Sequence, residues 1–167
     1  MQAAVLFTMD KKDYTDDMPL IERFGVRALI CRDGLWAMQI GNDGIYKIPG
    51  GGIEGDETYE EALIREVREE TGLLVIDDSI KSIGEVTEIR EDIFKKGHKY
   101  IAHSFFYFCD AKDEMTEMKL TNSEIEKGYR LEWAKLDHII ETNERLQTEN
   151  WTKRDTLFLK WMKERVG

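Results

Sequence analysis

A glycine-rich turn that leads directly into a carboxylate-rich helix constrains the fold of this chain more than any other segment. Residues 51–73 read GGIEGDETYEEALIREVREETGL. Thr58 and Glu61 have the spacing of a capping box, which satisfies free N–H groups at the start of a helix. Gly72 fits the left-handed position at which many helices end. The sequence therefore predicts a helix between Thr58 and Gly72, preceded by a loop whose glycine backbone can closely approach a ligand.

Three carboxylates gather on one face of this predicted helix. Glu66, Glu69 and Glu70 are spaced i, i+3 and i+4, so they lie one above another across about one turn. Like charges that close repel one another, and the helix gains no stability from them alone. A divalent cation such as Mg²⁺ or Mn²⁺ prefers oxygen ligands and would offset this repulsion. The arrangement predicts a metal site built to hold an anionic group.

The spacing of the whole segment is specific. It fits the pattern G-x5-E-x7-R-E-U-x-E-E-x-G-U, in which U is a bulky aliphatic residue. The matching residues are Gly51, Glu57, Arg65, Glu66, Val67, Glu69, Glu70, Gly72 and Leu73. At ordinary residue frequencies, a chance match in a chain of this length is on the order of one in a million. The segment resembles the Nudix box, and the chain is similar to Nudix (MutT-like) hydrolases.

The resemblance implies an α/β fold, namely a Nudix-type α/β/α sandwich with a mixed sheet, a central Nudix helix and a C-terminal helix. The rest of the sequence is compatible with that fold, because strand-like segments alternate with helical ones. Strands are expected over residues 3–8, 24–31, 35–40, 45–48, 73–76, 80–89, 100–109 and 129–136. Further helices are expected over residues 137–143 and 152–165. Residues 1–167 are interpreted as a single Nudix hydrolase domain, with the box at residues 51–73.

The resemblance also implies a reaction, which is metal-dependent hydrolysis of the diphosphate linkage in a nucleoside diphosphate linked to another moiety. Water attacks phosphorus, Mg²⁺ is the implied cofactor, and Mn²⁺ is a substitute. The alternative is a non-catalytic Nudix domain that senses or binds a ligand, although such domains usually have a degraded box. An isomerase of isoprenoid diphosphates is a third interpretation. It would need a cysteine and additional His and Glu metal ligands in its pocket, and this chain has only 3 histidines.

Residue roles follow from the resemblance position by position. Glu66, Glu69 and Glu70 are the implied metal ligands, together with the backbone carbonyl of Gly50. Glu69 and Glu70 are also the box residues that can orient the attacking water, although a carboxylate bound to metal is a poor base. The family often takes its base from a later loop. The sequence offers three candidates and does not choose among them: Glu124, Glu126 and Glu132.

The remaining box residues have implied structural or binding roles. Glu57 and Arg65 resemble the ion pair that holds the loop of the box against the helix. On an ideal helix, the position of Arg65 is angled away from the carboxylate face, which agrees with a structural role. Gly51 and Gly52 are expected to bring the loop backbone close to the substrate. Lys47, just upstream of the glycines, is a candidate to face a phosphate.

Several other side chains have two interpretations. Five aromatic residues can stack on a base, although core packing is the simpler interpretation for each: Phe24, Tyr46, Phe94, Tyr100 and Trp133. A basic cluster can hold phosphates or form a solvated hairpin tip, and the tip is favoured: Lys95, Lys96, His98 and Lys99. His103 lies in an apolar strand, which favours a core histidine with satisfied hydrogen bonds.

Composition limits the classes of partner. The chain has 34 acidic and 24 basic residues and a net charge of −10, which argues against binding to nucleic acid or anionic membranes. No apolar run approaches the ~18 residues of a membrane span, and the first residues do not resemble a signal peptide. Cys31 and Cys109 lie in apolar runs and are expected to be reduced core thiols of a cytoplasmic protein. The expected partner is a small-molecule nucleotide or diphosphate substrate, and the expected state is a monomer or homodimer.

Overall fold

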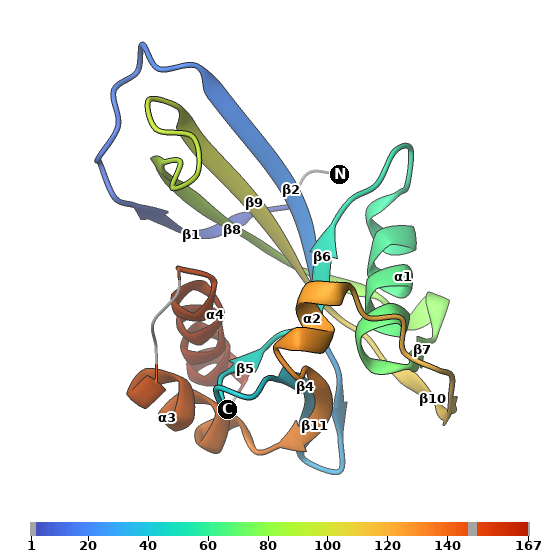
Figure 1. The fold of residues 1–167 in the computed structure, drawn as a ribbon. Coiled ribbons are helices and arrows are strands. Elements are labelled where there is room, and N and C mark those ends of the chain that lie inside the picture. The colour runs from blue at the N-terminus through green and yellow to red at the C-terminus, as the bar shows by residue number, and fades with distance from the viewer. Residues whose placement is uncertain (1–2, 147–149, 167) are drawn as a thin grey trace.

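A five-stranded mixed sheet is the main feature of the fold. The computed structural model describes residues 3–146 and 150–166. The strand order is β1-β8-β9-β2-β6, in which β1 and β8 are parallel, as are β9 and β2, and the other neighbours are antiparallel. The bounds are β1 (Val5–Asp10), β2 (Leu20–Leu29), β6 (Gly50–Gly52), β8 (Lys81–Glu91) and β9 (Lys99–Phe108). Figure 1 shows β2, β8 and β9 projecting well beyond the helices.

Within residues 3–146 and 150–166, smaller sheets and four helices complete the fold. One sheet joins β3 (Cys31–Arg32), β4 (Leu35–Ile40), β5 (Tyr46–Lys47) and β11 (Arg130–Ala134), and another pairs β7 (Leu73–Val75) with β10 (Ala111–Met115). The helices are α1 (Tyr59–Thr71), α2 (Asn122–Glu126), α3 (Leu136–Leu146) and α4 (Asn150–Val166), and a 3-10 turn spans Asp77–Ser79. In the two described stretches, no helix is both long and apolar enough to cross a lipid bilayer.

Two hydrophobic cores lie on opposite faces of the main sheet. Along β9, Phe105 faces α1 and packs with Leu63 and Val67, whereas Phe106 faces α4 and stacks on Phe158 with ring centroids 3.8 Å apart. Successive residues of a strand point to opposite faces, so one apolar strand supplies both cores. This arrangement confirms the predicted α/β fold with a mixed sheet covered by helices on both faces (Figure 1).

The ends of α1 agree with the sequence prediction. The Thr58 hydroxyl accepts from the N–H of Glu61 at 3.1 Å, and the Glu61 carboxylate accepts from the N–H of Thr58 at 3.0 Å. Gly72 has a φ of 78°, and its N–H donates to the carbonyl of Arg68 at 2.9 Å. Positive φ is inexpensive only for glycine, so the sequence fixes where this helix stops.

Other elements differ from the prediction. Strand β2 begins at Leu20, four residues before the expected residue 24, because residues 20–23 pair in parallel with β9. The prediction had no counterpart for β10, whose residues are mostly exposed and polar and become a strand only through pairing with β7. Cys31 is exposed and only Cys109 is buried, so the expectation of two core thiols is wrong for Cys31. Cys31 lies at the start of the two-residue strand β3, where its side chain faces outward.

Candidate active site

Gly50 and Gly51 of β6 let backbone lie where no side chain fits. A Cβ added at Gly50 would stand 1.9 Å from the carbonyl oxygen of Val26, and one at Gly51 would stand 2.6 Å from the carboxylate carbon of Glu66. Gly50 also has a φ of 152°, which disfavours other residues. The loop is therefore pressed between the sheet on one side and the carboxylate helix on the other.

Glu70 is the most buried of the three helix carboxylates, with 4% of its surface exposed. It accepts a hydrogen bond from the N–H of Gly50 at 2.7 Å, and the Nζ of Lys47 lies 3.3 Å from its other oxygen. Burial raises the pKa of Glu70 to about 7, and the Lys47 charge and the Gly50 N–H oppose that rise only in part. Glu70 thus joins the helix to the loop and to the predicted phosphate-facing lysine.

The ion pair expected between Glu57 and Arg65 is present. Arg65 donates from Nε at 2.6 Å and from Nη2 at 2.9 Å to the two oxygens of Glu57, which is a bidentate arrangement. Nη2 also donates to the carbonyl of Gly52 at 3.1 Å. The hydrogen bond from Arg65 lowers the pKa of Glu57 to about 2. Arg65 therefore ties the end of the glycine loop to the helix.

The guanidinium of Arg65 does not point away from the carboxylate face, so that part of the sequence prediction is wrong. Its Nη1 lies 2.9 Å from Glu66 and 3.3 Å from Glu69. A long arginine side chain can bend along the helix surface, and the field of several carboxylates attracts its charge. Arg65 therefore spans from the loop to two of the three predicted metal ligands.

The residues present fit a hard divalent cation by donor type. Three carboxylates and the glycine backbone lie together, and all offer oxygen ligands of the kind that Mg²⁺ and Mn²⁺ prefer. Burial raises the pKa of Glu66, although Arg65 opposes the rise, and Glu70 is shifted in the same direction. Burial thus outweighs the positive charge that already lies beside both carboxylates. Within the described residues, no three acidic, His or Cys side chains converge on one point, because these carboxylates turn to Arg65 and Lys47 instead. The carbonyl of Gly50 as a ligand stays a prediction.

The structure distinguishes among the three candidate bases. Glu124 in α2 lies close enough to Glu70 for the two carboxylates to influence each other. Burial opposes its ionisation, but the hydrogen bond from the Thr121 N–H, together with neighbouring groups that include the Lys47 charge, outweighs this and lowers the pKa of Glu124. By contrast, Glu132 is bonded to the Tyr46 hydroxyl, and Glu126 is exposed. The sequence held a signal for α2 that we did not use, because Thr121 and Glu124 form a second capping box.

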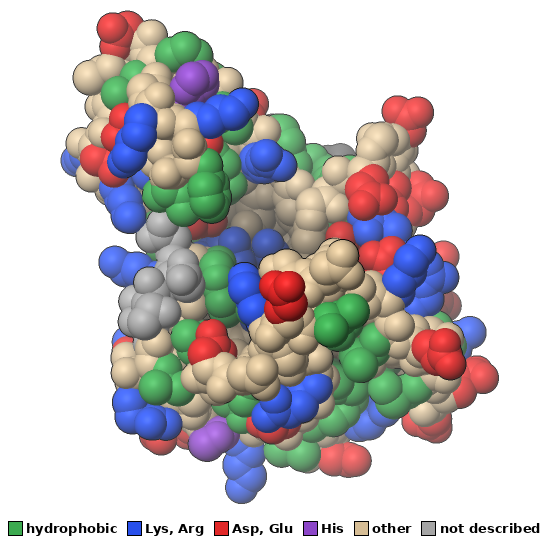
Figure 2. All heavy atoms as spheres, viewed as in Figure 1, with side chains coloured by type: hydrophobic (Ala, Val, Ile, Leu, Met, Phe, Trp, Pro, Cys, Tyr) green, Lys and Arg blue, Asp and Glu red, His purple; other side chains and the backbone are tan. Residues whose placement is uncertain are grey.

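A cleft of about 460 Å³ opens between the β8–β9 hairpin tip and α4, and no residue of α1 is part of its described lining. Tyr129 belongs to its wall, and the Nζ of Lys47 lies 5.8 Å from the centre of the Tyr129 ring. The cleft therefore reaches the neighbourhood of Glu70. Figure 2 shows a deep hollow between the projecting end of the sheet and the body of the molecule, with Lys and Arg side chains on its floor.

Arginines form that floor. Arg154 is buried, donates to Asp155 at 3.0 Å and lies 3.5 Å from Glu88. Arg27 lies behind it, and burial together with the charge of Arg154 lowers the pKa of Arg27 to about 10. Among the described residues, the buried Nε and Nη1 atoms of Arg27 and Arg90 have no hydrogen-bond partner. Free buried donors on cationic groups favour an anionic ligand, in contrast to the acidic charge of the whole chain.

Aromatic side chains form the upper part of the cleft. Phe94 at the hairpin tip is 89% exposed, and Tyr100 and Trp151 line the cleft with it. Of the five aromatic candidates from the sequence, only Phe94 and Tyr100 are brought to this site. The other three lie elsewhere: Phe24 on the opposite face of the sheet, Tyr46 in the core and Trp133 under Arg32.

Sequence reasoning missed the arginines of the floor and Trp151. Arg27 interrupts an otherwise apolar run, and a charge inside a core strand is itself a signal of a special environment. The basic cluster at the hairpin tip does not line the cleft; Lys99 lies 3.2 Å from Asp16 and Lys96 lies 3.8 Å from Glu91. This agrees with the solvated tip that the sequence favoured.

Comparisons with known proteins agree with the box and the fold. The chain is 34% identical over 76 residues to the 8-oxo-dGTP diphosphatase of Proteus vulgaris, covering 46% of this chain and 61% of the relative. It is 41% identical over 71 residues to a putative 8-oxo-dGTP diphosphatase of Bacillus subtilis, covering 42% and 44%. It is 50% identical over 48 residues to the RNA pyrophosphohydrolase of Xylella fastidiosa (strain 9a5c), covering 28% and 25%. The chain thus spans less than two thirds of the length of these curated relatives.

The solved structures cover more of the chain. A NUDIX hydrolase from Nitrosomonas europaea aligns with a TM-score of 0.60 at 20% identity, covering 87% of this chain and 92% of that one. A MutT NUDIX hydrolase from Burkholderia pseudomallei aligns with a TM-score of 0.52 at 24% identity, covering 70% and 85%. These likenesses establish the fold. The family model of the NUDIX domain matches residues 21–161, most of the chain. On this match the chain belongs to the Nudix family.

Proposed function

We propose that this protein is a metal-dependent hydrolase that cleaves the diphosphate linkage of a nucleoside diphosphate linked to another moiety. The observation that carries this proposal is the position of Glu70. It lies buried between the N–H of Gly50 and the Nζ of Lys47, on the carboxylate face of α1, and that Nζ is 5.8 Å from the ring of Tyr129, which lines the cleft with the arginines. Carboxylates suited to a cation and cations suited to phosphate therefore adjoin one another, as hydrolysis of a diphosphate requires.

Glu66, Glu69, Glu70 and the carbonyl of Gly50 would hold the metal. Mg²⁺ is the proposed cofactor, with Mn²⁺ as a substitute, because all four ligands are oxygens. When bound there, such a metal neutralises phosphate charge and lowers the pKa of a water molecule. Arg65 holds the loop and helix together through Glu57 and keeps Glu66 and Glu69 in place.

Glu124 is the proposed general base. It lies near Glu70, at the edge of the carboxylate face, and its lowered pKa keeps it ionised near neutral pH. An ionised carboxylate that is not itself a metal ligand can accept a proton from the attacking water. The phosphates of the substrate are proposed to contact the side chain of Lys47 and the backbone of Gly51 and Gly52.

The cleft is proposed to hold the rest of the substrate. Arg90 and Arg154 supply positive charge for a phosphate, whereas Phe94, Tyr100 and Trp151 offer rings on which a base can stack. The curated relatives are named for 8-oxo-dGTP and for RNA, which makes a nucleotide the proposed substrate class. A free nucleotide suits the acidic net charge of −10 better than a nucleic acid does.

Two alternatives have weaker support. A ligand sensor would not need an intact box with a buried, bonded Glu70. An isomerase would need a cysteine in its pocket, and in the described part of the chain neither Cys31 nor Cys109 lines the cleft. The cytoplasmic location and the choice between monomer and homodimer stay predictions.

The test is phosphate release from a panel of substrates with Mg²⁺, measured through a coupled phosphatase. The panel contains nucleoside diphosphate derivatives, 8-oxo-dGTP and a 5′-triphosphorylated RNA, and Glu70→Gln is assayed beside wild type. Glu114→Gln is the matched control, because Glu114 is an exposed carboxylate on β10. The proposal expects turnover of at least one nucleotide that is lost only in Glu70→Gln. Equal turnover in Glu70→Gln, or ligand-induced melting shifts without turnover, would contradict it.

A further inference from the structure

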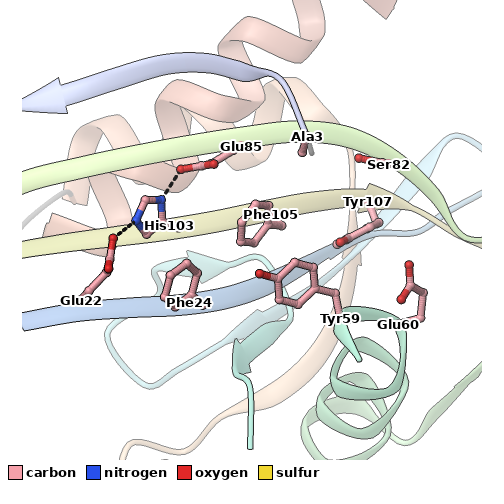
Figure 3. A pocket seen from close by; sticks show the side chains of 10 residues that line it. All are labelled: Ala3, Glu22, Phe24, Tyr59, Glu60, Ser82, Glu85, His103, Phe105 and Tyr107. Carbon is pink, nitrogen blue, oxygen red and sulfur yellow. Dashed lines mark hydrogen bonds and ion pairs between the residues drawn. The ribbon is translucent and has the colours of Figure 1, made fainter. Parts of the chain in front are cut away.

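A second cavity, of about 500 Å³, lies on the other face of the sheet from the cleft. Its floor is formed by the projecting parts of β2, β8 and β9, and its wall by the first turn of α1 (Figure 3). Along β8, Glu85 lines this cavity and Glu88 lines the cleft, which are positions of opposite parity on one strand. The two sites are therefore separated by the thickness of the sheet.

Aromatic rings form much of this cavity. Phe24 stacks on His103 with ring centroids 4.7 Å apart and planes 9° apart, and Tyr59 stacks on Phe105 at 4.7 Å and 22°. Phe24 and Tyr59 are exposed, so the cavity keeps apolar ring surface in contact with water. Exposed aromatic faces around a concave site are typical of ligand pockets, and they attract cations.

The polar groups of the cavity are acidic. Glu22, Glu60 and Glu85 line it, and its described lining contains neither lysine nor arginine. His103 is the sole basic group among these residues. Its ring contacts Glu85 through Nδ1 and Glu22 through Nε2 at 2.7 Å (dashed in Figure 3). One imidazole contacts two of the three carboxylates, so the net charge of the cavity stays negative even when His103 is protonated.

An anionic ligand is disfavoured despite the helix that begins here. The positive end of a helix attracts anions only through free N–H groups and an uncompensated dipole. In α1 the capping box occupies the N–H groups of Thr58 and Glu61, and Glu60 adds negative charge to the first turn. The proposed phosphate substrate therefore has no counterpart on this side of the sheet.

We propose that this cavity binds a small organic cation, a primary ammonium or guanidinium carried on a short apolar chain. The apolar chain lies against the rings of Phe24 and Tyr59, and the cationic group is held by Glu22 and Glu85, with Glu60 on the opposite wall. Cation–π attraction and carboxylate pairing act together on such a ligand. A volume of about 500 Å³ is within the range of small-molecule sites. The inference does not depend on the proposed hydrolase activity.

The test is calorimetric titration of the intact protein with agmatine, which carries a guanidinium and an amine on a four-carbon chain. We expect saturable binding that weakens roughly 2- to 10-fold in Glu22→Gln and in Phe24→Leu, where one carboxylate or one ring is removed. Phe24→Leu keeps an apolar side chain, so it separates attraction to the ring from simple burial. Both positions are exposed at the surface, and melting curves check that the variants fold.

Matched controls separate this cavity from other acidic surface. Glu114→Gln on β10 and Glu69→Gln on the carboxylate face of α1 should leave agmatine binding unchanged. Neutral 1,5-pentanediol and anionic glutarate should not bind. Absence of saturable agmatine binding would overturn the proposal, as would equal loss in Glu69→Gln and Glu22→Gln. Binding of a capped Gly-Arg-Gly peptide without binding of agmatine would also overturn it, because the occupant would then be a protein side chain.

Discussion

The two ends of α1 gather the same type of residue and differ in what surrounds it. At the last turns, Glu66, Glu69 and Glu70 face the guanidinium of Arg65, the ammonium of Lys47 and a backbone N–H. At the first turn, Glu60 faces a cavity that it shares with Glu22 and Glu85, two carboxylates of the sheet that contact one histidine among aromatic rings. A glutamate alone thus specifies little. The groups packed against it decide whether the site suits a metal and phosphates or an organic cation.

Two buried carboxylates of β8 show the same contrast between the two faces of the main sheet. Glu85 and Glu88 lie on opposite faces of β8, and each is 5% exposed. Glu88 is compensated by Arg154 at 3.5 Å, in the cleft that carries free arginine donors. Glu85 is compensated by His103, in the cavity without lysine or arginine among its described lining. A buried carboxylate needs a partner on either face, and the identity of that partner gives the two faces their opposite preferences.

The largest expected effect is the loss of hydrolysis when metal is removed from the carboxylate face of α1. A chelator such as EDTA should abolish nucleotide hydrolysis, and excess Mg²⁺ or Mn²⁺ should restore it, because the proposed mechanism needs a cation among Glu66, Glu69 and Glu70. The same treatment should leave agmatine binding at the second cavity unchanged. Phosphate release and calorimetry on one protein preparation check both. Full hydrolysis in chelator would remove the metal mechanism.

A large loss of stability is expected when Arg65, which joins the glycine loop to helix α1, is replaced. Arg65→Gln removes the bidentate bond to Glu57 and leaves Glu66 and Glu69 without their cation. The free energy of unfolding should fall by about 2 kcal/mol, the usual size for hydrogen bonds to a charged group. Urea unfolding measures it, and Arg68→Gln on the same helix is the control. An equal change in both variants would show that the ties of Arg65 add no stability.

A paired ring deletion sharpens the contrast between the faces. Phe94→Ala should raise KM for the nucleotide roughly 2- to 10-fold, because a stacked ring contributes about 0.5–1.5 kcal/mol. Phe24→Ala removes a ring of the same size on the other face and should leave KM unchanged. Steady-state kinetics measure KM for the nucleotide in both variants. An increase in KM only for Phe24→Ala would reverse the assignment of the two faces.

The smallest effect concerns pH at the second cavity. Burial opposes a charged His103, but the bonds to Glu85 and Glu22 outweigh it and raise the pKa of His103. A raised folded pKa adds stability that is complete below the unfolded pKa and is lost as pH rises through the folded value. His103→Gln should therefore destabilise the protein more at about pH 6 than at about pH 9. Melting curves at both pH values test this, and a larger loss at high pH would contradict it.

The local features of the box were predictable because each depends on residues close in sequence. Thr58, Glu61 and Gly72 set the ends of α1 through caps within a few residues. The pairing of Glu57 with Arg65 joins residues eight apart and was implied by the spacing of the box. The alternation of apolar residues likewise indicated the strands that form both cores.

Contacts between distant segments were not predictable from one sequence. Glu124 was one of three equal candidates until the fold brought α2 to Glu70, 54 positions earlier in the chain (124 − 70). Arg90 and Arg154 came to line one cleft only because the β8–β9 hairpin and α4 lie on the same side of it. Even the direction of the Arg65 guanidinium was mispredicted, since ideal helix geometry places Cβ atoms and not the charged end of a long side chain.

The sequence by itself thus determined the box, the caps of its helix and the two-sided sheet. The tertiary structure alone decided which charges meet, which base adjoins Glu70, and which rings border each cavity. The physical reason is the distance along the chain over which each kind of interaction acts. Backbone propensity and capping act over a few residues, whereas compensation of a buried charge depends on whichever group the fold packs within about 4 Å.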